Sequence, residues 1–271
     1  MTKLDLPLAN KSLGQHFLKD QNVIHTICYD FKNSAEAIVE IGPGPGILTE
    51  TLAKRSIDEK LPFFVIEKDD RFPPYLLQFI KNEQITMTDA LAVSLSDFFR
   101  EKKIAFKKIW LVSNLPYNIS TPLLINFLQA PEIEFLTLMF QKEVADKVFP
   151  FSTTKNFMGS LHALTLTYFD CTLLCKVPPG AFAPPPKVDS AVLSMVRKKE
   201  PILPLSEFKS LEKFLRLLFA QKRKQLGGLL KSSFPQSLIE TTFNELNIPL
   251  TIRAEALTHA QVIDLYRKLK K

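Results

Sequence analysis

Short apolar runs rich in β-branched and aromatic residues alternate, over the first two thirds of the chain, with segments whose apolar residues recur at helical spacing. The apolar runs predict strands at 37–42, 62–68, 84–89, 108–114, 135–141, 171–177 and 191–198. The segments between them predict helices at 20–31, 47–55, 71–80, 122–129, 142–148 and 157–168. This alternation indicates a parallel, doubly wound α/β sheet, to which the last strands add an antiparallel edge.

The pattern changes after Lys199. The segment 200–208 contains two prolines and is a candidate linker, and beyond it apolar residues recur only at helical spacing. Thr258 and Gln261 have the spacing of a capping box, which predicts the start of a final helix. We therefore expect an α/β domain at 1–199 and a small all-helical domain at 200–271.

The positive charge of the chain is concentrated in its last quarter. The net charge is +7, yet residues 197–271 hold 15 Lys and Arg against 7 Asp and Glu, and the remainder holds 20 against 21. A basic domain beside a near-neutral one favours a nucleic acid as partner, the alternative being a solvated helical surface. Lys222, Arg223 and Lys224 lie in the helical pattern and are candidate RNA-backbone contacts.

Other features exclude several classes of protein. No window approaches 18 uninterrupted apolar residues, so no membrane span is expected, and the first residues lack the apolar segment of a signal peptide. The three cysteines and four histidines show no metal-ligand spacing, so we expect no metal. Reduced cysteines suit a cytoplasmic protein.

A glycine-rich loop follows the first strong strand, with Gly42, Gly44 and Gly46 just before a helix. Pro43 and Pro45 lack N–H groups, so the loop has few donors for a pyrophosphate. It suits close backbone approach by a ligand without phosphate. A glycine-rich turn alone is weak evidence for a binding site.

Acidic residues strengthen this interpretation. Glu67 ends the next strand, where a carboxylate can accept hydrogen bonds from both ribose hydroxyls, and Asp89 ends the third, where one can accept from an adenine amine. Each acid alone is commonly a surface residue. Ligands of open α/β sheets bind at the carboxyl ends of the strands, where the glycine loop, Glu67 and Asp89 all lie. Together these three features favour a nucleoside cofactor, of which S-adenosylmethionine is the common one.

The chain resembles the small-subunit ribosomal RNA adenine dimethyltransferase family. The resemblance rests on KSLGQHFLKDQNVI, EIGPGPGILT, NLPYNIST, LMFQKEVADKV and PPGAFAPPPKVDSAV, and it continues through FAQKRKQL and IPLTIRAEALT. It implies a Rossmann-like class I methyltransferase sheet with a C-terminal helical domain. It also implies S-adenosylmethionine-dependent N6-dimethylation of two adjacent adenosines near the 3′ end of 16S rRNA. Two alternatives stay open: a large-subunit rRNA methyltransferase and a non-catalytic binding factor.

The resemblance also implies which residues hold the cofactor. The family's contacts fall on His16, Leu18, Gly42, Gly44, Glu67, Asp89 and Asn114. The chain departs from the family at His16, where Asn is common. An imidazole can still offer one donor or acceptor to the cofactor.

The segment Asn114-Leu115-Pro116-Tyr117 follows a predicted strand and suits an adenine amine. The Asn114 side-chain oxygen and the Leu115 carbonyl can accept hydrogen bonds from the two N–H groups of the amine. Pro116 biases Leu115 toward an extended backbone, and Tyr117 can stack on the base. The alternative is a plain strand-to-helix turn.

Two residues in or next to the proline-rich loop, 178–186, complete the predicted site. Phe182 is the candidate second stacking face, held exposed by the stiff run Pro184–Pro186, although most of the 22 phenylalanines belong to the core. Lys187 is a candidate phosphate contact. We expect a monomer that acts on the small ribosomal subunit or its precursor.

Overall fold

A computed structural model describes residues 15–105, 107–151, 158–221 and 223–270. The described residues form two compact units, one within 1–145 and 171–197, the other within 146–170 and 198–271. The division after Arg197 lies close to the expected domain boundary at 199/200. The segment 146–170 joins the helical unit, which the strand and helix pattern did not indicate.

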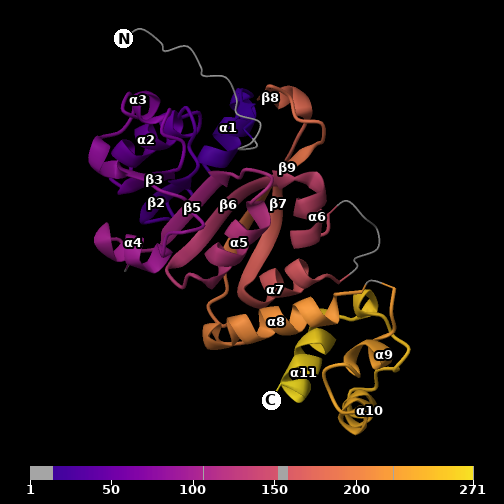
Figure 1. Cartoon of the computed structure of the whole chain (residues 1–271). Coiled ribbons are helices and arrows are strands. Elements are labelled where there is room, and N and C mark those ends of the chain that lie inside the picture. Colours follow the sequence, from indigo (N-terminus) through magenta and orange to yellow (C-terminus); the bar gives the residue numbers. More distant parts are fainter. Residues whose placement is uncertain (1–14, 106, 152–157, 222, 271) are drawn as a thin grey trace. The chain divides into compact units, whose positions relative to one another are not determined.

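A seven-stranded sheet organises the first unit, in the order β4-β3-β2-β5-β6-β9-β7 (Figure 1). Its strands are β2 Ala37–Ile41, β3 Phe63–Glu67, β4 Ile85–Met87, β5 Ile109–Asn114, β6 Ile133–Gln141, β7 Phe169–Val177 and β9 Ser190–Arg197. The strands from β4 to β6 pair in parallel, and β9 pairs antiparallel to β6. The predicted doubly wound sheet with an antiparallel edge is confirmed.

The parallel strands are connected by the helices α2 Thr49–Asp58, α3 Pro73–Leu76, α4 Leu95–Glu101 and α5 Ser120–Gln129. Helix α1 Gln21–Cys28 precedes β2, and α6 Lys142–Val148 follows β6. The apolar sides of α1 and α2 pack in one core cluster with side chains of β2, β3 and β5, among them Ile38, Val65 and Trp110. The strand β2 is buried at all five positions, as expected for a central parallel strand. Helix α4 was not predicted.

A second, two-stranded sheet joins distant parts of the chain. Strand β1, Phe17–Leu18, pairs antiparallel with β8, Phe182–Ala183. The amide of Lys19 extends this pairing by donating to the carbonyl of Ala181, at 2.8 Å. The segment that precedes α1 is thereby fastened to the proline-rich loop.

The second unit is helical. It contains α7 Ser160–Tyr168, α8 Phe208–Leu218, α9 Leu226–Leu230, α10 Gln236–Glu245 and α11 His259–Leu269. Short 3₁₀ turns lie at 82–84, 179–181, 205–207 and 254–256 of the chain. Helix α11 begins with the predicted capping box, in which Thr258 and Gln261 satisfy each other's backbone amides. Over the described parts of the chain, no helix combines the length and hydropathy needed to cross a membrane.

Candidate active site

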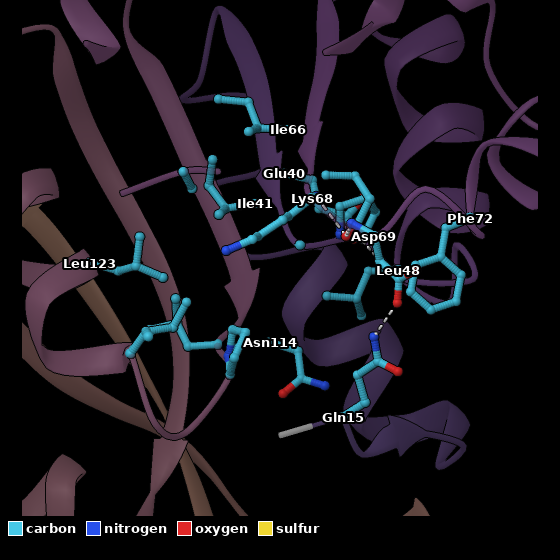
Figure 2. A pocket seen from close by; sticks show the side chains of 18 of the residues that line it. Gln15, Glu40, Ile41, Leu48, Ile66, Lys68, Asp69, Phe72, Asn114 and Leu123 are labelled. Carbon is cyan, nitrogen blue, oxygen red and sulfur yellow. Dashed lines mark hydrogen bonds between the residues drawn. The ribbon is translucent and has the colours of Figure 1, made fainter. Parts of the chain in front are cut away.

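A cavity of about 270 Å³ lies where the parallel strands end, close to the lower end of the size range of small-molecule sites. The side chains in Figure 2 surround it, with Asn114 across the cavity from Ile66. The structure brings to its wall these predicted residues: His16, Leu18, Gly42, Gly44, Glu67, Asp89, Asn114, Leu115, Pro116 and Tyr117. The cavity therefore unites the predicted cofactor contacts with the Asn-Leu-Pro-Tyr segment.

The glycine loop after β2 leaves open space for a ligand. Gly42 has φ +65°, and a Cβ on it would meet no atom within 4 Å, so the backbone here borders free volume. Gly44 has φ +57°, and its amide donates to Glu67 Oε2 at 2.9 Å. Such positive φ values favour glycine, which has no Cβ. A ligand can therefore approach the backbone closely at Gly42.

Glu67 is held by backbone amides at the end of β3. Its Oε1 accepts from the amides of Lys68 and Asp69 at 2.8 and 2.7 Å, in addition to the bond from Gly44. The side chain is 5% exposed, and this burial raises the pKa of Glu67, while the backbone donors oppose the shift. A carboxylate has about four lone-pair sites, and three are used here, so Glu67 retains acceptor capacity for one more donor, at Oε2.

Asp89 follows β4 at the rim of the same cavity. Its Oδ1 accepts from the amide of Leu91 at 2.9 Å, and its Oδ2 lies 2.7 Å from the ammonium of Lys68. The hydrogen bond from Lys68, followed by that from Leu91, holds the pKa of Asp89 below its usual value. Asp89 is therefore an ionised acceptor near neutral pH.

Asn114 is oriented by a backbone carbonyl. Its Nδ2 donates to the carbonyl oxygen of His16 at 3.2 Å, so its Oδ1 is free to serve a different donor. The preceding Ser113 is 1% exposed and its hydroxyl donates to the carbonyl of Ile41 at 2.6 Å. This bond ties the end of β5 to the start of the glycine loop. The side-chain amide of Asn114 therefore stands at a strand end that is fixed to the neighbouring strand.

Tyr117 is anchored at its hydroxyl and at one face. The hydroxyl lies 2.7 Å from Ser190 Oγ at the start of β9. The ring of His16 stacks on Tyr117 with 5.6 Å between centroids. Burial raises the pKa of Tyr117, which keeps the phenol neutral. The ring is thus a fixed, uncharged platform beside Asn114.

Residues 15–16 join the cavity wall to the loop that holds Pro184, which the sequence pattern did not reveal. Gln15 donates to Asp69 Oδ2 at 2.8 Å, as Figure 2 shows, and His16 Nδ1 lies 2.9 Å from the carbonyl of Pro184. Gln15, Lys68 and Asp69 line the cavity but were not predicted site residues. No spacing rule marks them, because their partners lie far away along the chain.

Glu40, on β2, was also missed. It lines the cavity and is 2% exposed, and burial raises its pKa to about 8. Thr49 Oγ1 donates to its Oε2 at 2.7 Å. In the sequence it is simply one polar residue within an apolar strand.

The proline-rich loop departs from expectation. Phe182 was predicted to be an exposed stacking ring, but it is 1% exposed and packs in the core cluster with Leu18 and Val177. The reason is the pairing of β8 with β1, which directs this ring inward. Ala183, Pro184 and Pro185 are exposed, as are Pro178 and Gly180. Lys187, the candidate phosphate contact, is exposed too.

The predicted basic run is not helical where the structure describes it. Arg223 and Lys224 are exposed in the connection between α8 and α9, and Lys222 lies outside the described residues. Helix α8 ends at Leu218, before this run, and Gln225, just after it, forms an isolated antiparallel bridge with Arg253. Arg253 therefore joins Arg223 and Lys224 on neighbouring segments. Its position 28 residues further along the chain hid this from the sequence pattern.

Two of the three cysteines are buried. Cys28 and Cys171 are buried free thiols, and no cluster of three His, Cys, Asp or Glu side chains with metal-binding geometry occurs in the described ranges. Burial raises the pKa of Cys171 to about 12, which makes this thiol unreactive near neutral pH.

Comparisons with known proteins agree with this geometry. The sequence profile of a family described as Ribosomal RNA adenine dimethylase matches residues 7–271. The chain is 34% identical over 258 residues to the ribosomal RNA small subunit methyltransferase A of Streptococcus gordonii, which covers 91% of this chain and 87% of that protein. It is 33% identical over 264 residues to the protein of the same name from Mycoplasma pneumoniae, covering 96% and 95%.

Solved structures share the fold. A dimethyladenosine transferase from Plasmodium falciparum superposes with a TM-score of 0.73 at 23% identity, covering 93% of this chain and 98% of that one. The 23S rRNA methyltransferase ErmE superposes with a TM-score of 0.65 at 24% identity, covering 94% and 100%. The class I methyltransferase fold expected from the sequence is confirmed.

Proposed function

The chain belongs to the ribosomal RNA adenine dimethylase family, and we propose that its substrate is the small-subunit (16S) rRNA, in which it dimethylates two adjacent adenosines near the 3′ end during ribosome assembly. Family membership makes it an enzyme that transfers methyl groups from S-adenosylmethionine to N6 of adenine in rRNA. Small-subunit relatives at 33–34% identity, aligned over 91–96% of this chain, support this substrate.

One observation carries the proposal: the cavity that holds Glu67 and Asp89 also holds Asn114 and Tyr117. The acids suit a nucleoside cofactor, and the amide beside an aromatic ring suits a second, flipped-out adenine. Among the described residues this is one continuous cavity. A methyl donor and a methyl acceptor can therefore meet inside it.

We assign the cofactor to the residues at the ends of β2, β3 and β4. Glu67 accepts a hydrogen bond from a ribose hydroxyl, Asp89 accepts one from the adenine amine, and the open backbone at Gly42 passes beside the ligand. His16 and Leu18 contact its methionine end. When bound, the cofactor supplies an electrophilic methyl group on sulfonium.

The residues after β5 receive the target adenine. Asn114 Oδ1 and the Leu115 carbonyl accept hydrogen bonds from the two N–H groups of the amine. These bonds favour the more tetrahedral geometry in which the nitrogen attacks a methyl group. Tyr117 stacks on the base and limits its rotation. No strong base is needed, because an alkylated, protonated amine releases its proton readily. These residues therefore work by alignment.

The proposal is tested by the choice of substrate. Purified protein, radiolabelled S-adenosylmethionine and either small-subunit particles or protein-free large-subunit RNA are combined, and dimethyladenosine is quantified in each. Labelling of two adjacent adenosines near the 3′ end of the small-subunit RNA is expected. Labelling of the large-subunit RNA instead favours the resistance-type alternative, and labelling of neither favours a binding factor.

Cofactor affinity should depend on Glu67. Glu67→Ala removes the ribose acceptor, and we expect at least about tenfold weaker binding of S-adenosylmethionine, or about 1.4 kcal/mol. Calorimetry measures the affinity, with Glu50→Ala on the exposed surface of α2 as the matched control. Unchanged affinity in a variant that melts like the wild type would refute the ribose assignment.

RNA affinity should depend on the basic run of the helical unit that contains the exposed residues Arg223 and Lys224. Replacing Lys222, Arg223 and Lys224 by Ala should flatten the slope of log affinity against log salt by up to about three units, because each phosphate contact releases counterions. Fluorescence anisotropy with small-subunit RNA measures the slope. Cofactor affinity should stay unchanged, since the cavity residues belong to the other unit. Equal slopes for variant and wild type would reduce this run to a solvated surface.

A further inference from the structure

Lys68 forms an ion pair with Asp89, the carboxylate that we assign to the cofactor's adenine. Its ammonium lies 2.7 Å from Asp89 Oδ2, while Oδ1 already accepts from the amide of Leu91. Lys68 directly follows Glu67 at the end of β3 and is the one Lys or Arg among the described residues that line the cavity. Both oxygens of Asp89 therefore have partners within the protein.

A ligand can displace this ion pair at little cost in free energy. The Lys68 side chain is 61% exposed and that of Asp89 30% exposed, and ion pairs with this degree of solvent contact contribute little to stability. The flexible four-carbon side chain of Lys68 lets its ammonium move into water without a change in the backbone conformation. The Leu91 amide, in contrast, is a backbone donor that holds Oδ1 in place. Oδ2 is thus the oxygen that a ligand amine can claim.

We propose that Lys68 is an affinity-determining residue that competes with the adenine amine for Asp89, and thereby limits how tightly both the methyl donor and its demethylated product are held. The inference rests on the proposed role of Asp89 in binding adenine. Dimethylation of each adenine consumes two donor molecules, so product must leave between transfers. A displaceable internal cation at the adenine end eases that exchange.

The test measures binding of S-adenosylhomocysteine, the demethylated product, to wild type and to Lys68→Met. Methionine keeps an unbranched apolar stem and removes the charge. We expect the variant to bind about threefold tighter at low salt, a gain of the size that a solvent-exposed ion pair provides, and the gain to vanish at high salt. Because this ligand carries no net charge, a general electrostatic effect of removing a cation does not account for the gain.

Two further ligands and variants isolate the mechanism. The inosine counterpart of the product carries an acceptor, O6, in place of the amine, so Lys68→Met should not tighten its binding. Lys54→Met, which removes an exposed lysine paired with Glu50 on α2, controls for net charge and should change neither affinity. Equal tightening for both ligands, or unchanged or weaker binding of the adenine ligand, would overturn the proposal.

Asp89→Asn separates this inference from the proposed function. If Asp89 binds adenine, this variant weakens binding of S-adenosylhomocysteine whatever Lys68 does. Weakening by Asp89→Asn without tightening by Lys68→Met defeats the role of Lys68 alone. Unchanged affinity in Asp89→Asn defeats the assignment of Asp89 itself, and the role of Lys68 with it.

Discussion

Replacing Asn114 by Ala should lower the single-turnover rate of methyl transfer by at least about 100-fold, while RNA affinity changes far less. The bond from Nδ2 to the His16 carbonyl directs Oδ1 toward a different donor, so the acceptor is preorganised before substrate arrives. Removing one preorganised hydrogen-bonding group from a transition state typically costs about 100-fold or more. RNA affinity is spread over many contacts and is not expected to follow.

Three variants make this measurement decisive. Asn114→Asp keeps an acceptor oxygen and should retain more activity than Asn114→Ala. Asn126→Ala on α5 changes the same residue type away from the cavity and should behave like the wild type. Quenched-flow single-turnover assays with saturating RNA give the rates. A rate for Asn114→Ala within a factor of three of wild type would show that the amine is not gripped by this side chain.

Replacing Arg55 by Met should lower the free energy of unfolding by about 3–5 kcal/mol, the cost of breaking a buried charge network. Arg55 is 2% exposed and donates to the carbonyls of Cys28, Asp30 and Phe31 at 2.7–3.1 Å. It also pairs with Glu59 and lies over the ring of Trp110. Methionine fills part of the volume but leaves buried carbonyls without a donor.

Urea titrations followed by circular dichroism measure this loss. Lys54→Met, one residue earlier on the exposed side of α2, should shift the midpoint little. Arg55→Lys retains the charge but loses the forked donor geometry, so it should fall between Arg55→Met and the wild type. A loss below about 1 kcal/mol for Arg55→Met would mean that water or a rearranged loop replaces the lost donors.

Local pattern was sufficient for most of the first unit. Seven apolar runs were predicted as strands, and each corresponds to a strand of the large sheet. The periods of strands and helices are local properties of the backbone, so they can be recognised without knowledge of the rest of the chain. Helix α4, Leu95–Glu101, was missed, although α6 has the same length of seven residues and was predicted.

The grouping of polar residues and glycine at the strand ends could be predicted for a topological reason. Gly42, Glu67, Asp89 and Asn114 each stand at or just after a strand end, and parallel strands bring such ends to one edge of the sheet. Residue type and position in the strand therefore sufficed. The precise partners of each side chain did not follow from this rule.

What the sequence by itself determined is the order of elements, the type of sheet and the polar groups at the strand ends, since these depend on residues close together in the chain. Only the tertiary structure decided that β1 meets β8 and turns Phe182 inward, that Lys68 reaches Asp89, and that Gln225 meets Arg253. Gly227 illustrates the reason: a Cβ there would lie 2.9 Å from the carbonyl oxygen of Leu250. Contacts of this kind join residues some 20 to 165 positions apart, and they are selected by the packing of the whole core, which no local period encodes.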